Sequence, residues 1–243
     1  MKILIIIPAY NEEKNIKNLI VQLDQLDKPG TSKFEVIVVN DKSTDNTLDV
    51  LKQLDIKFID LPCNLGIGGA VQTGYKYAKL NNFDIAIQVD GDGQHDPVFI
   101  DKLIRPIVEG EADLVIGSRY LNKEGFQSTI LRRIGIRYFS NVIKFFTGQL
   151  ITDPTSGFRA CNNKVIDEFV AYYPVDYPEP ESIVSILRTG HVIQEIPVIM
   201  TERLNGKSSI NSFKSIYYMI KVSIAIFIDA LRKERKVSRL QSQ

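Results

Sequence analysis

The sequence predicts an α/β fold in which a mostly parallel sheet is flanked by helices. Short apolar runs alternate with amphipathic helical stretches along the first half of the chain, a pattern typical of a doubly wound parallel sheet. Polar clusters follow the apolar runs where the strands would end. At 243 residues the chain is long enough for one large domain with an appendage. We expect the main domain to cover residues 1–210, and an amphipathic, basic C-terminal helix and tail to cover residues 211–243.

The expected strands are short apolar runs bounded by glycine, proline, asparagine or acidic residues. They cover residues 3–7, 34–39, 56–61, 85–89, 113–117 and 191–200. Helices are expected where apolar residues recur at helical spacing. These segments are 12–26, one that Ser43 and Thr44 would cap and that carries Leu48, Leu51 and Leu54, 70–80, 99–107, 128–147, a stretch from about 164, one that ends near 189, and 216–231. Residues 152–159 are expected to form a loop, and residues 174–180 a proline-rich turn.

The C-terminal segment 216–231 is strongly apolar, although it contains Lys221 and Asp229, and a basic tail follows it. It is shorter than the roughly 20 residues that a membrane-spanning helix needs. One interpretation is a core-packing helix with a basic tail. The other is an interfacial helix that lies on an anionic bilayer, with its basic residues at the headgroups.

Composition excludes several classes of protein. A hydrophobic content of 44% and a charged content of 24% are those of an ordinary globular domain. The net charge of +1 provides no global field for binding nucleic acid. Cys63 and Cys161 are isolated in the sequence and are expected to be reduced thiols. The chain starts with a strand-like run rather than a signal peptide, so a cytoplasmic location is expected.

Asp90 and Asp92 stand one residue apart at the end of the expected strand 85–89, with Gln94 close behind. Ligands of open α/β sheets bind beyond the carboxyl ends of the strands. Two carboxylates and an amide are hard oxygen ligands of the kind that Mg²⁺ or Mn²⁺ takes together with substrate phosphates. The alternative is an ordinary turn, because Asp-Gly is common turn chemistry.

Similar polar clusters follow the other strands. They are residues 8–13, 40–45, 64–70 and 117–119. A convergence of polar groups on one rim of the sheet indicates a ligand site rather than a purely structural domain. The glycines of 64–70 lack the spacing of a dinucleotide-binding motif, so that interpretation is weak.

These motifs resemble those of a known family. Pro-Ala-Tyr-Asn-Glu-Glu, Val-Val-Asn-Asp-Lys-Ser-Thr-Asp, Asn-x-Gly-x-Gly-Gly-Ala, Asp-Gly-Asp-Gly-Gln-His and Gly-Ser-Arg-Tyr are similar to motifs of the inverting family-2 glycosyltransferases, which have the GT-A (Rossmann-like) fold. Within that family the chain is most similar to the dolichyl-phosphate mannose synthase-like branch. The resemblance covers roughly residues 1–210.

The resemblance implies a site for a nucleotide diphosphate sugar. The residues implied in donor binding are Pro8, Tyr10, Glu12, Val39, Asp41, Asn64, Asp90, Gly91, Arg119 and Arg203. Asp90, Asp92 and Gln94 would hold Mg²⁺ or Mn²⁺, and Asp92 is also implied in catalysis. The metal would stabilise the charge on the leaving diphosphate, and Arg119 would assist through its bidentate fork.

The acceptor side is implied by a second group of residues, Arg133, Asp153 and Arg159. The two arginines could meet an acceptor phosphate, or they could be surface arginines. The loop that carries Arg203 has Ser209 where mannose synthases carry a lysine, and Lys207 could substitute for that lysine.

Glu179 falls at the position of an acid that precedes a helix ending in glycine in related enzymes. A hydroxyl acceptor needs such a carboxylate to take its proton. An anionic phosphate acceptor needs no base, and Glu179 would then position the donor sugar or the acceptor. Both roles remain open at this point.

The leading interpretation is an inverting, metal-dependent glycosyltransferase that acts on polyprenyl phosphate at the cytoplasmic membrane face, bound peripherally to that membrane. A first alternative is transfer to a sugar hydroxyl of a cell-wall or cell-surface glycan. A nucleotidyltransferase is less favoured, because residues 8–11 do not form a glycine-rich, basic loop. A non-catalytic nucleotide-sugar-binding scaffold is the last alternative. The expected partners are the nucleotide sugar, the acceptor and a membrane surface, with a homo-oligomer or a membrane-protein partner as a further expectation and no nucleic acid.

Overall fold

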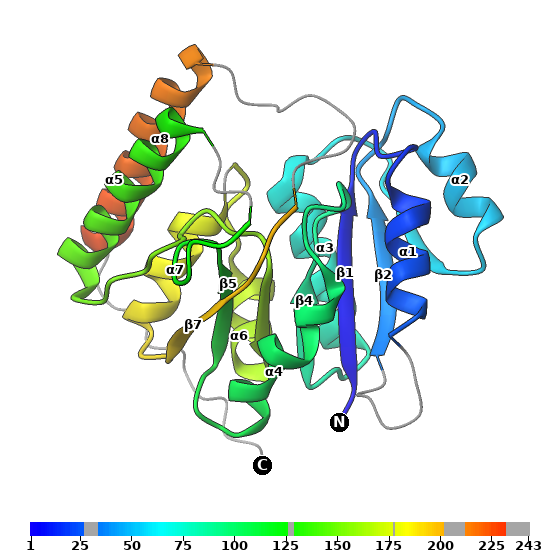
Figure 1. The fold of residues 1–243 in the computed structure, drawn as a ribbon, viewed down its shortest axis with the longest axis horizontal. Helices are drawn as coiled ribbons and strands as arrows, with labels where there is room; N and C mark the ends of the chain where they lie inside the picture. Colours follow the sequence, from blue (N-terminus) through cyan, green and yellow to red (C-terminus); the bar gives the residue numbers. More distant parts are fainter. Residues whose placement is uncertain (27–33, 126–128, 177, 202–211, 232–243) are drawn as a thin grey trace.

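A computed structural model of the chain describes residues 1–26, 34–125, 129–176, 178–201 and 212–231 (Figure 1). In the described residues the strands form one mixed sheet with helices on both faces. The strands are β1 (Ile3–Ala9), β2 (Phe34–Asn40), β3 (Lys57–Asp60), β4 (Ile85–Gln88), β5 (Leu114–Ser118), β6 (Arg159–Asn162) and β7 (Ile193–Pro197). The helices are α1 (Ile16–Asp24), α2 (Thr47–Gln53), α3 (Gly66–Leu80), α4 (Ile100–Val108), α5 (Ile130–Thr147), α6 (Asn163–Ala171), α7 (Pro178–Arg188) and α8 (Ser212–Leu231). A short 3₁₀ turn, Pro97–Phe99, precedes α4.

The sheet order is β3-β2-β1-β4-β6-β5-β7, and it is mostly parallel, as the sequence predicted. The exception is β6, which runs antiparallel between β4 and β5. The sequence analysis missed this strand, because it placed a loop up to Arg159 and assigned nothing to the next residues. The strand is four residues long and offers only Ala160 and Cys161 as apolar side chains. It is held by its pairing with neighbours on both sides, which a local pattern does not reveal.

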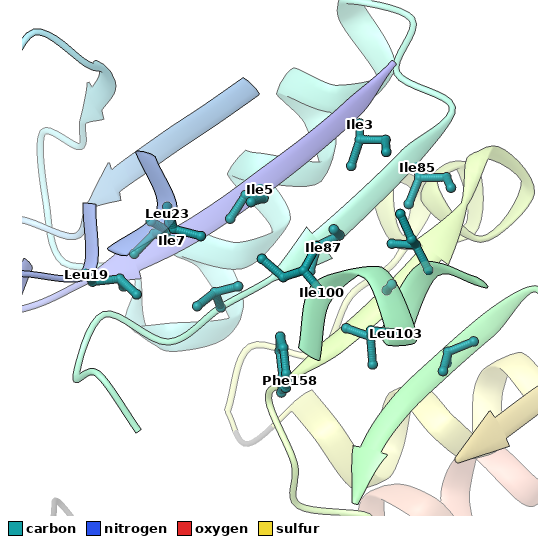
Figure 2. Packing of buried hydrophobic residues seen from close by; sticks show 14 of the residues in the cluster. Ile3, Ile5, Ile7, Leu19, Leu23, Ile85, Ile87, Ile100, Leu103 and Phe158 are labelled. Atoms are coloured by element: carbon teal, nitrogen blue, oxygen red, sulfur yellow. The ribbon is translucent and has the colours of Figure 1, made fainter. Parts of the chain in front are cut away.

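Each face of the sheet has its own hydrophobic core. Along β4, Ile85 and Ile87 face one core while Ala86 faces the other, as strand alternation requires. Figure 2 shows the first core, in which β1 and β4 pack against α1 and α4. The second core lies beneath α3, α6 and α7. The sheet is therefore covered by helices on both faces, as the alternation of strands and helices in the sequence predicted.

Helices α5 and α8 lie side by side and form an outer layer over α7 (Figure 1). The Tyr138 hydroxyl hydrogen-bonds the Ser223 hydroxyl at 2.9 Å, and Phe146 contacts Phe227 edge to face. Lys221 of α8 pairs with Asp176 in the loop before α7. No helix in the described part of the chain is both long and apolar enough to cross a membrane.

The helix α7 begins at Pro178, inside the segment that was expected to be a turn. Proline is compatible with the first turn of a helix, because that turn leaves its N–H groups without partners in the helix. This start places Glu179 in the first turn of α7. The helix then runs to Arg188, close to the expected end near residue 189.

Candidate active site

The loops after β1 and β2 are tied together by hydrogen bonds. The Asn11 N–H donates to the Ser43 hydroxyl at 3.0 Å, and the Thr44 N–H donates to the Asn11 side-chain oxygen at 2.8 Å. The Glu12 N–H donates to the Thr47 hydroxyl at 2.8 Å. The convergence of strand ends on one rim, expected from the sequence, is therefore present in the structure.

The loop after β4 lies against the loop after β1. A Cβ added to Gly91 would lie 3.0 Å from the Pro8 carbonyl oxygen and 3.4 Å from Glu12 Cγ, so the close approach favours glycine here. Pro8 is buried, whereas Tyr10 is 47% exposed and offers its ring at the rim. These residues, expected to border the nucleotide, form one continuous edge of the site.

Asp41 links the loop after β2 to the start of α3. Its carboxylate accepts a hydrogen bond from the Leu65 N–H at 2.6 Å, and its carbonyl oxygen accepts one from the Asn64 side chain at 3.0 Å. Burial raises the pKa of Asp41, although hydrogen bonds from the Leu65 and Gly66 N–H groups oppose this. Val39, expected to read the base, has a fully buried side chain that packs on Leu61 and Ala70. Asp41 and Asn64 are therefore the polar groups at this end of the site.

Asp90, Asp92 and Gln94 follow β4 on the same rim. Asp92 accepts a hydrogen bond from the Gln94 N–H at 3.0 Å, and the Gln94 amide nitrogen donates to the Thr201 carbonyl at 3.3 Å. The second bond turns the Gln94 side-chain oxygen away from Thr201. The Asp90 side chain is 34% exposed. Two carboxylates and an amide oxygen are a donor set suited to Mg²⁺ or Mn²⁺.

The described residues hold no cluster of three or more His, Cys, Asp or Glu side chains with metal-site geometry. A site with two acids fits a cation that completes its coordination with substrate phosphates and water. The residues present therefore fit a metal–diphosphate complex better than a cage built by protein alone.

Arg119 forms a buried pair with Asp153. Its Nε donates to Asp153 Oδ2 at 2.7 Å, and its Nη2 donates to Asp153 Oδ1 at 2.8 Å. Both side chains are buried, with Asp153 at 0% exposure. The bidentate fork that was expected to bind the diphosphate is thus directed at Asp153, and Asp153 is not accessible to an acceptor. The pair instead ties the end of β5 to the loop before β6.

Arg159 is also buried, at 0% exposure, so it is neither a surface arginine nor an open phosphate ligand. Its Nε and Nη2 donate to the Ser156 carbonyl at 3.1 and 2.7 Å, and its Nη1 donates to the Ser182 hydroxyl at 3.0 Å. Its guanidinium therefore joins the loop before β6 to the first turns of α7. The expected direct contact with an acceptor phosphate is not supported by these partners.

Glu179 has the most perturbed carboxyl group of the site. Burial raises its pKa to about 7; the nearby charge of Arg159 lowers the pKa and that of Asp90 raises it. These three charged groups come from α7, β6 and the end of β4. The structure thus brings Glu179 close enough to Asp90 for the charge of Asp90 to act on its pKa.

The start of α5 faces the same region. Burial raises the pKa of Tyr120, while the charges of Arg119, Arg132 and Arg133 oppose this shift. Arg132 also acts on the pKa of Glu179. Arg133, expected on the acceptor side, is exposed, and Arg132 is a neighbouring cation that the sequence analysis did not single out. Arg203, with the rest of its loop, lies outside the described residues.

Gln88 and His95 also contact Asp90, and neither was predicted from the sequence to belong to the site. Gln88 is fully buried at the end of β4, and its amide nitrogen donates to Asp90 at 3.3 Å. His95 is 4% exposed and accepts a hydrogen bond from the Asp90 N–H at 3.0 Å. A signal for Gln88 existed, because a polar residue stands on a strand face that is otherwise apolar. His95 stood inside a quoted motif but had no assigned role.

Comparison with known proteins gives a consistent result. A model of the family described as "Glycosyl transferase family 2" matches residues 4–171. The chain is 31% identical to the UDP-N-acetylglucosamine–dolichyl-phosphate N-acetylglucosaminyltransferase of Methanococcus voltae, over 93% of this chain and 98% of that protein. It is 30% identical to the dolichol-phosphate mannosyltransferase of Pyrococcus furiosus, over 91% of this chain and 64% of that protein.

Solved structures share the fold. Glucosyl-3-phosphoglycerate synthase of Mycobacterium tuberculosis, in complex with Mn²⁺, UDP and phosphoglyceric acid, aligns with a TM-score of 0.69 and 20% identity, covering 94% of this chain and 78% of that chain. TarS 1-349 of S. aureus, in complex with UDP-GlcNAc, aligns with a TM-score of 0.64 and 22% identity, covering 96% of this chain and 68% of that chain. The sheet and its helices therefore form a GT-A fold, as expected from the sequence.

Proposed function

The chain belongs to glycosyl transferase family 2, and from this premise we propose that it transfers one sugar from a nucleoside diphosphate sugar to a polyprenyl phosphate. It is a glycosyltransferase that uses nucleotide sugars. The observation that carries the proposal is the shared edge of the sheet, where Asp41 follows β2 and Asp90, Asp92 and Gln94 follow β4. This edge combines polar groups at one end with oxygen ligands suited to a metal–diphosphate at the other.

The acceptor is supported by the relatives. The M. voltae protein, which this chain matches over nearly its whole length, is named for transfer to dolichyl phosphate. The P. furiosus protein is named for the same acceptor class with another sugar. We therefore take a polyprenyl phosphate as the acceptor and UDP-N-acetylglucosamine as the first donor to test.

The proposed reaction breaks the bond between the anomeric carbon and the β-phosphate oxygen, and the nucleoside diphosphate leaves with the electron pair. An oxygen of the acceptor phosphate forms the new bond on the opposite face of the sugar, which inverts the configuration. A bound Mg²⁺ or Mn²⁺ would stabilise the negative charge of the leaving group. Asp90, Asp92 and Gln94 would hold that ion.

Glu179 suits a phosphate acceptor. A pKa of about 7 leaves a large fraction of this carboxyl neutral at neutral pH. A neutral carboxyl repels an anionic acceptor less than a carboxylate does, and it can donate a hydrogen bond. Glu179 would then position the acceptor without removing a proton.

The same pKa favours a second candidate, which is transfer to a sugar hydroxyl of a growing glycan. A general base works best when its pKa lies near the operating pH, and Glu179 meets that condition. The two candidates differ in what they require of Glu179. A hydroxyl acceptor needs its carboxylate, whereas a phosphate acceptor does not.

The deciding experiment measures sugar transfer from labelled nucleotide sugars, beginning with UDP-N-acetylglucosamine, to polyprenyl phosphate in detergent. We expect organic-extractable label that requires Mg²⁺ or Mn²⁺ and is lost with EDTA and with Asp92→Ala. Glu179→Gln should retain measurable transfer to the lipid phosphate. Donor turnover with label only on added glycan, lost by a factor of about 100 or more in Glu179→Gln, would replace this proposal with the hydroxyl acceptor.

We also propose that the enzyme lies peripherally on the cytoplasmic face of a membrane, where its lipid acceptor would be. The support is the outer layer formed by α5 and α8. Apolar side chains on this layer are exposed at Ile130, Ile134, Phe145, Ile220, Ile224 and Phe227. The exposed Arg133 and Arg137 of α5 stand on the same layer, and their charge matches that of anionic headgroups. The division into a catalytic domain, 1–210, and a C-terminal basic helix and tail, 211–243, is part of this proposal.

A further inference from the structure

Gln88 is a buried polar residue whose bonds lead to the donor acids. It shares the face of β4 that carries Ala86 and is fully buried against the core beneath α3, α6 and α7. Its amide nitrogen donates to Asp90 Oδ1 at 3.3 Å, and its amide oxygen accepts from the Tyr173 hydroxyl at 3.5 Å. Burying an amide is unfavourable unless it is hydrogen-bonded. An apolar side chain would suit the core equally well, so the amide serves Asp90.

His95 approaches Asp90 from the opposite face of the sheet. Its Nδ1 accepts the Asp90 N–H at 3.0 Å, which places the imidazole proton on Nε2. Nε2 in turn lies 3.6 Å from Asp90 Oδ2. The ring is 4% exposed and stacks on Phe158, with ring centroids 4.9 Å apart. Phe158 belongs to the core of Figure 2. The imidazole is therefore fixed by packing as well as by its hydrogen bond.

In addition to Gln88 and His95, Gly157 packs against the Asp90 carboxylate. A Cβ at this position would lie 2.7 and 2.8 Å from the two carboxylate oxygens of Asp90 and 3.0 Å from the Gln88 amide nitrogen. The loop before β6 thus packs directly on the contact between Gln88 and Asp90. Together these groups leave the Asp90 side chain about one-third exposed, at 34%.

We propose that Gln88 and His95 are positioning residues that hold the Asp90 carboxylate in the orientation needed to bind the metal–diphosphate. Gln88 is anchored on Tyr173 and His95 on Phe158, so each partner of Asp90 is itself fixed. Residues that orient a metal ligand from behind typically contribute 10–100-fold to metal affinity or activity. The inference rests on the proposed donor chemistry, and it adds two residues that no motif assigns to it.

The test measures binding of Mn²⁺ with UDP by calorimetry, without acceptor, in Gln88→Met and His95→Phe. The first variant keeps side-chain length without the amide, and the second keeps the stacking ring without the Nδ1 acceptor. We expect binding that is about 10–100-fold weaker in both, with thermal stability of the ligand-free protein changed far less. His95→Asn, which can place an oxygen near the Nδ1 position, should recover part of the affinity.

Gln72→Met is the matched control. Gln72 is a partly buried glutamine of α3 whose amide nitrogen donates to the Phe169 carbonyl at 3.2 Å, and it has no bond to Asp90. A purely structural role predicts similar losses of stability in Gln72→Met and Gln88→Met with unchanged affinity for Mn²⁺–UDP. Affinity within twofold of wild type in Gln88→Met and His95→Phe would overturn the inference.

Tyr173→Phe keeps the test decisive even where Gln88→Met does not fold. It removes only the hydroxyl that holds the Gln88 oxygen, so we expect by itself a smaller loss of Mn²⁺–UDP affinity, about 3–10-fold, and unchanged affinity would count against the inference. With a folded Gln88→Met protein, the double variant should lose no more affinity than Gln88→Met alone. Full additivity would count against a shared path through Gln88. A wild-type protein that binds Mn²⁺–UDP but labels no polyprenyl phosphate refutes the proposed acceptor and leaves this inference standing. Absence of Mn²⁺-dependent binding of UDP and of every other nucleoside diphosphate by the wild-type protein overturns both.

Discussion

The partly buried carboxyl group of Glu179 predicts a specific dependence of stability on pH. Its pKa is raised from the model-compound value of 4.5 to about 7, chiefly by burial. The native state therefore retains this proton at a pH where the unfolded chain has lost it. The contribution of the protonated group to the free energy of unfolding is complete below about pH 4.5, falls as the pH rises, and is lost above about pH 7.

The magnitude follows from the size of the shift. At roughly 1.4 kcal/mol for each pKa unit, the shift corresponds to about 3 kcal/mol between the two ends of this range. Other acids titrate in the same range, and Glu195 also has a raised pKa because it is buried. The useful quantity is therefore the difference between wild type and Glu179→Gln, in which the other groups cancel.

The assay is urea unfolding of both proteins from pH 5 to pH 8 in the presence of EDTA. Wild type should lose about 2–3 kcal/mol relative to Glu179→Gln as the pH rises across this range. A difference that stays constant with pH would refute the conclusion that the pKa of Glu179 is raised in the folded state. A difference that grows in the other direction would mean that Arg159 dominates over burial.

Three further outcomes are expected. Asp153→Ala should lower the free energy of unfolding by about 3–5 kcal/mol in urea titrations, because it leaves the buried Arg119 charge without its carboxylate. Asp153→Asn should lower it less, and equal losses in the two variants would argue against a charge pair. Phe145→Asp should weaken binding to anionic lipid vesicles about tenfold in sedimentation assays, whereas Leu80→Asp, at a similarly exposed site on α3, should not. An equal loss of binding in both variants would refute the proposal that α5 contacts the membrane. Gly68→Ala should destabilise the protein by about 1–3 kcal/mol in thermal unfolding and weaken nucleotide binding. Its Cβ would lie 2.0 and 2.4 Å from backbone oxygens of the loop before α7. An unchanged unfolding temperature would show that this loop can shift to accommodate the methyl group.

The sequence was informative where function depends on residues close together in the chain. Asp90, Asp92 and Gln94 could be identified as candidate metal ligands because their chemistry and spacing follow a predicted strand. The convergence of loops on one rim could also be predicted, since the carboxyl ends of parallel strands share an edge of the sheet. The structure confirms both the mostly parallel sheet and the common rim.

The sequence was less informative about what each charged group contacts. Arg119 was assigned to the diphosphate from its motif, yet its fork meets Asp153, which is 34 residues away in the chain. Arg159 was assigned to an acceptor phosphate, yet it is buried between two protein segments. The Gln88 partner Tyr173 is 85 residues distant. Such pairs depend on the position of β6 between β4 and β5, and that antiparallel strand was itself not predicted.

The pairing of the buried charges bears directly on the need for a metal. Arg119 is matched by Asp153, and Arg159 donates to neutral groups beside Glu179, whose pKa of about 7 leaves a large fraction of that carboxyl protonated at neutral pH. The Asp90 carboxylate accepts a hydrogen bond from the neutral amide of Gln88, and the Asp90 N–H donates to His95 Nδ1. Arg119 and Arg159 are therefore engaged in holding loops, and the rim carries the acidic side chain of Asp90, which is 34% exposed. A diphosphate leaving group adds further negative charge at the same place. A divalent cation between the acids and the diphosphate best balances these charges, which is why loss of the metal should abolish transfer more completely than loss of either arginine.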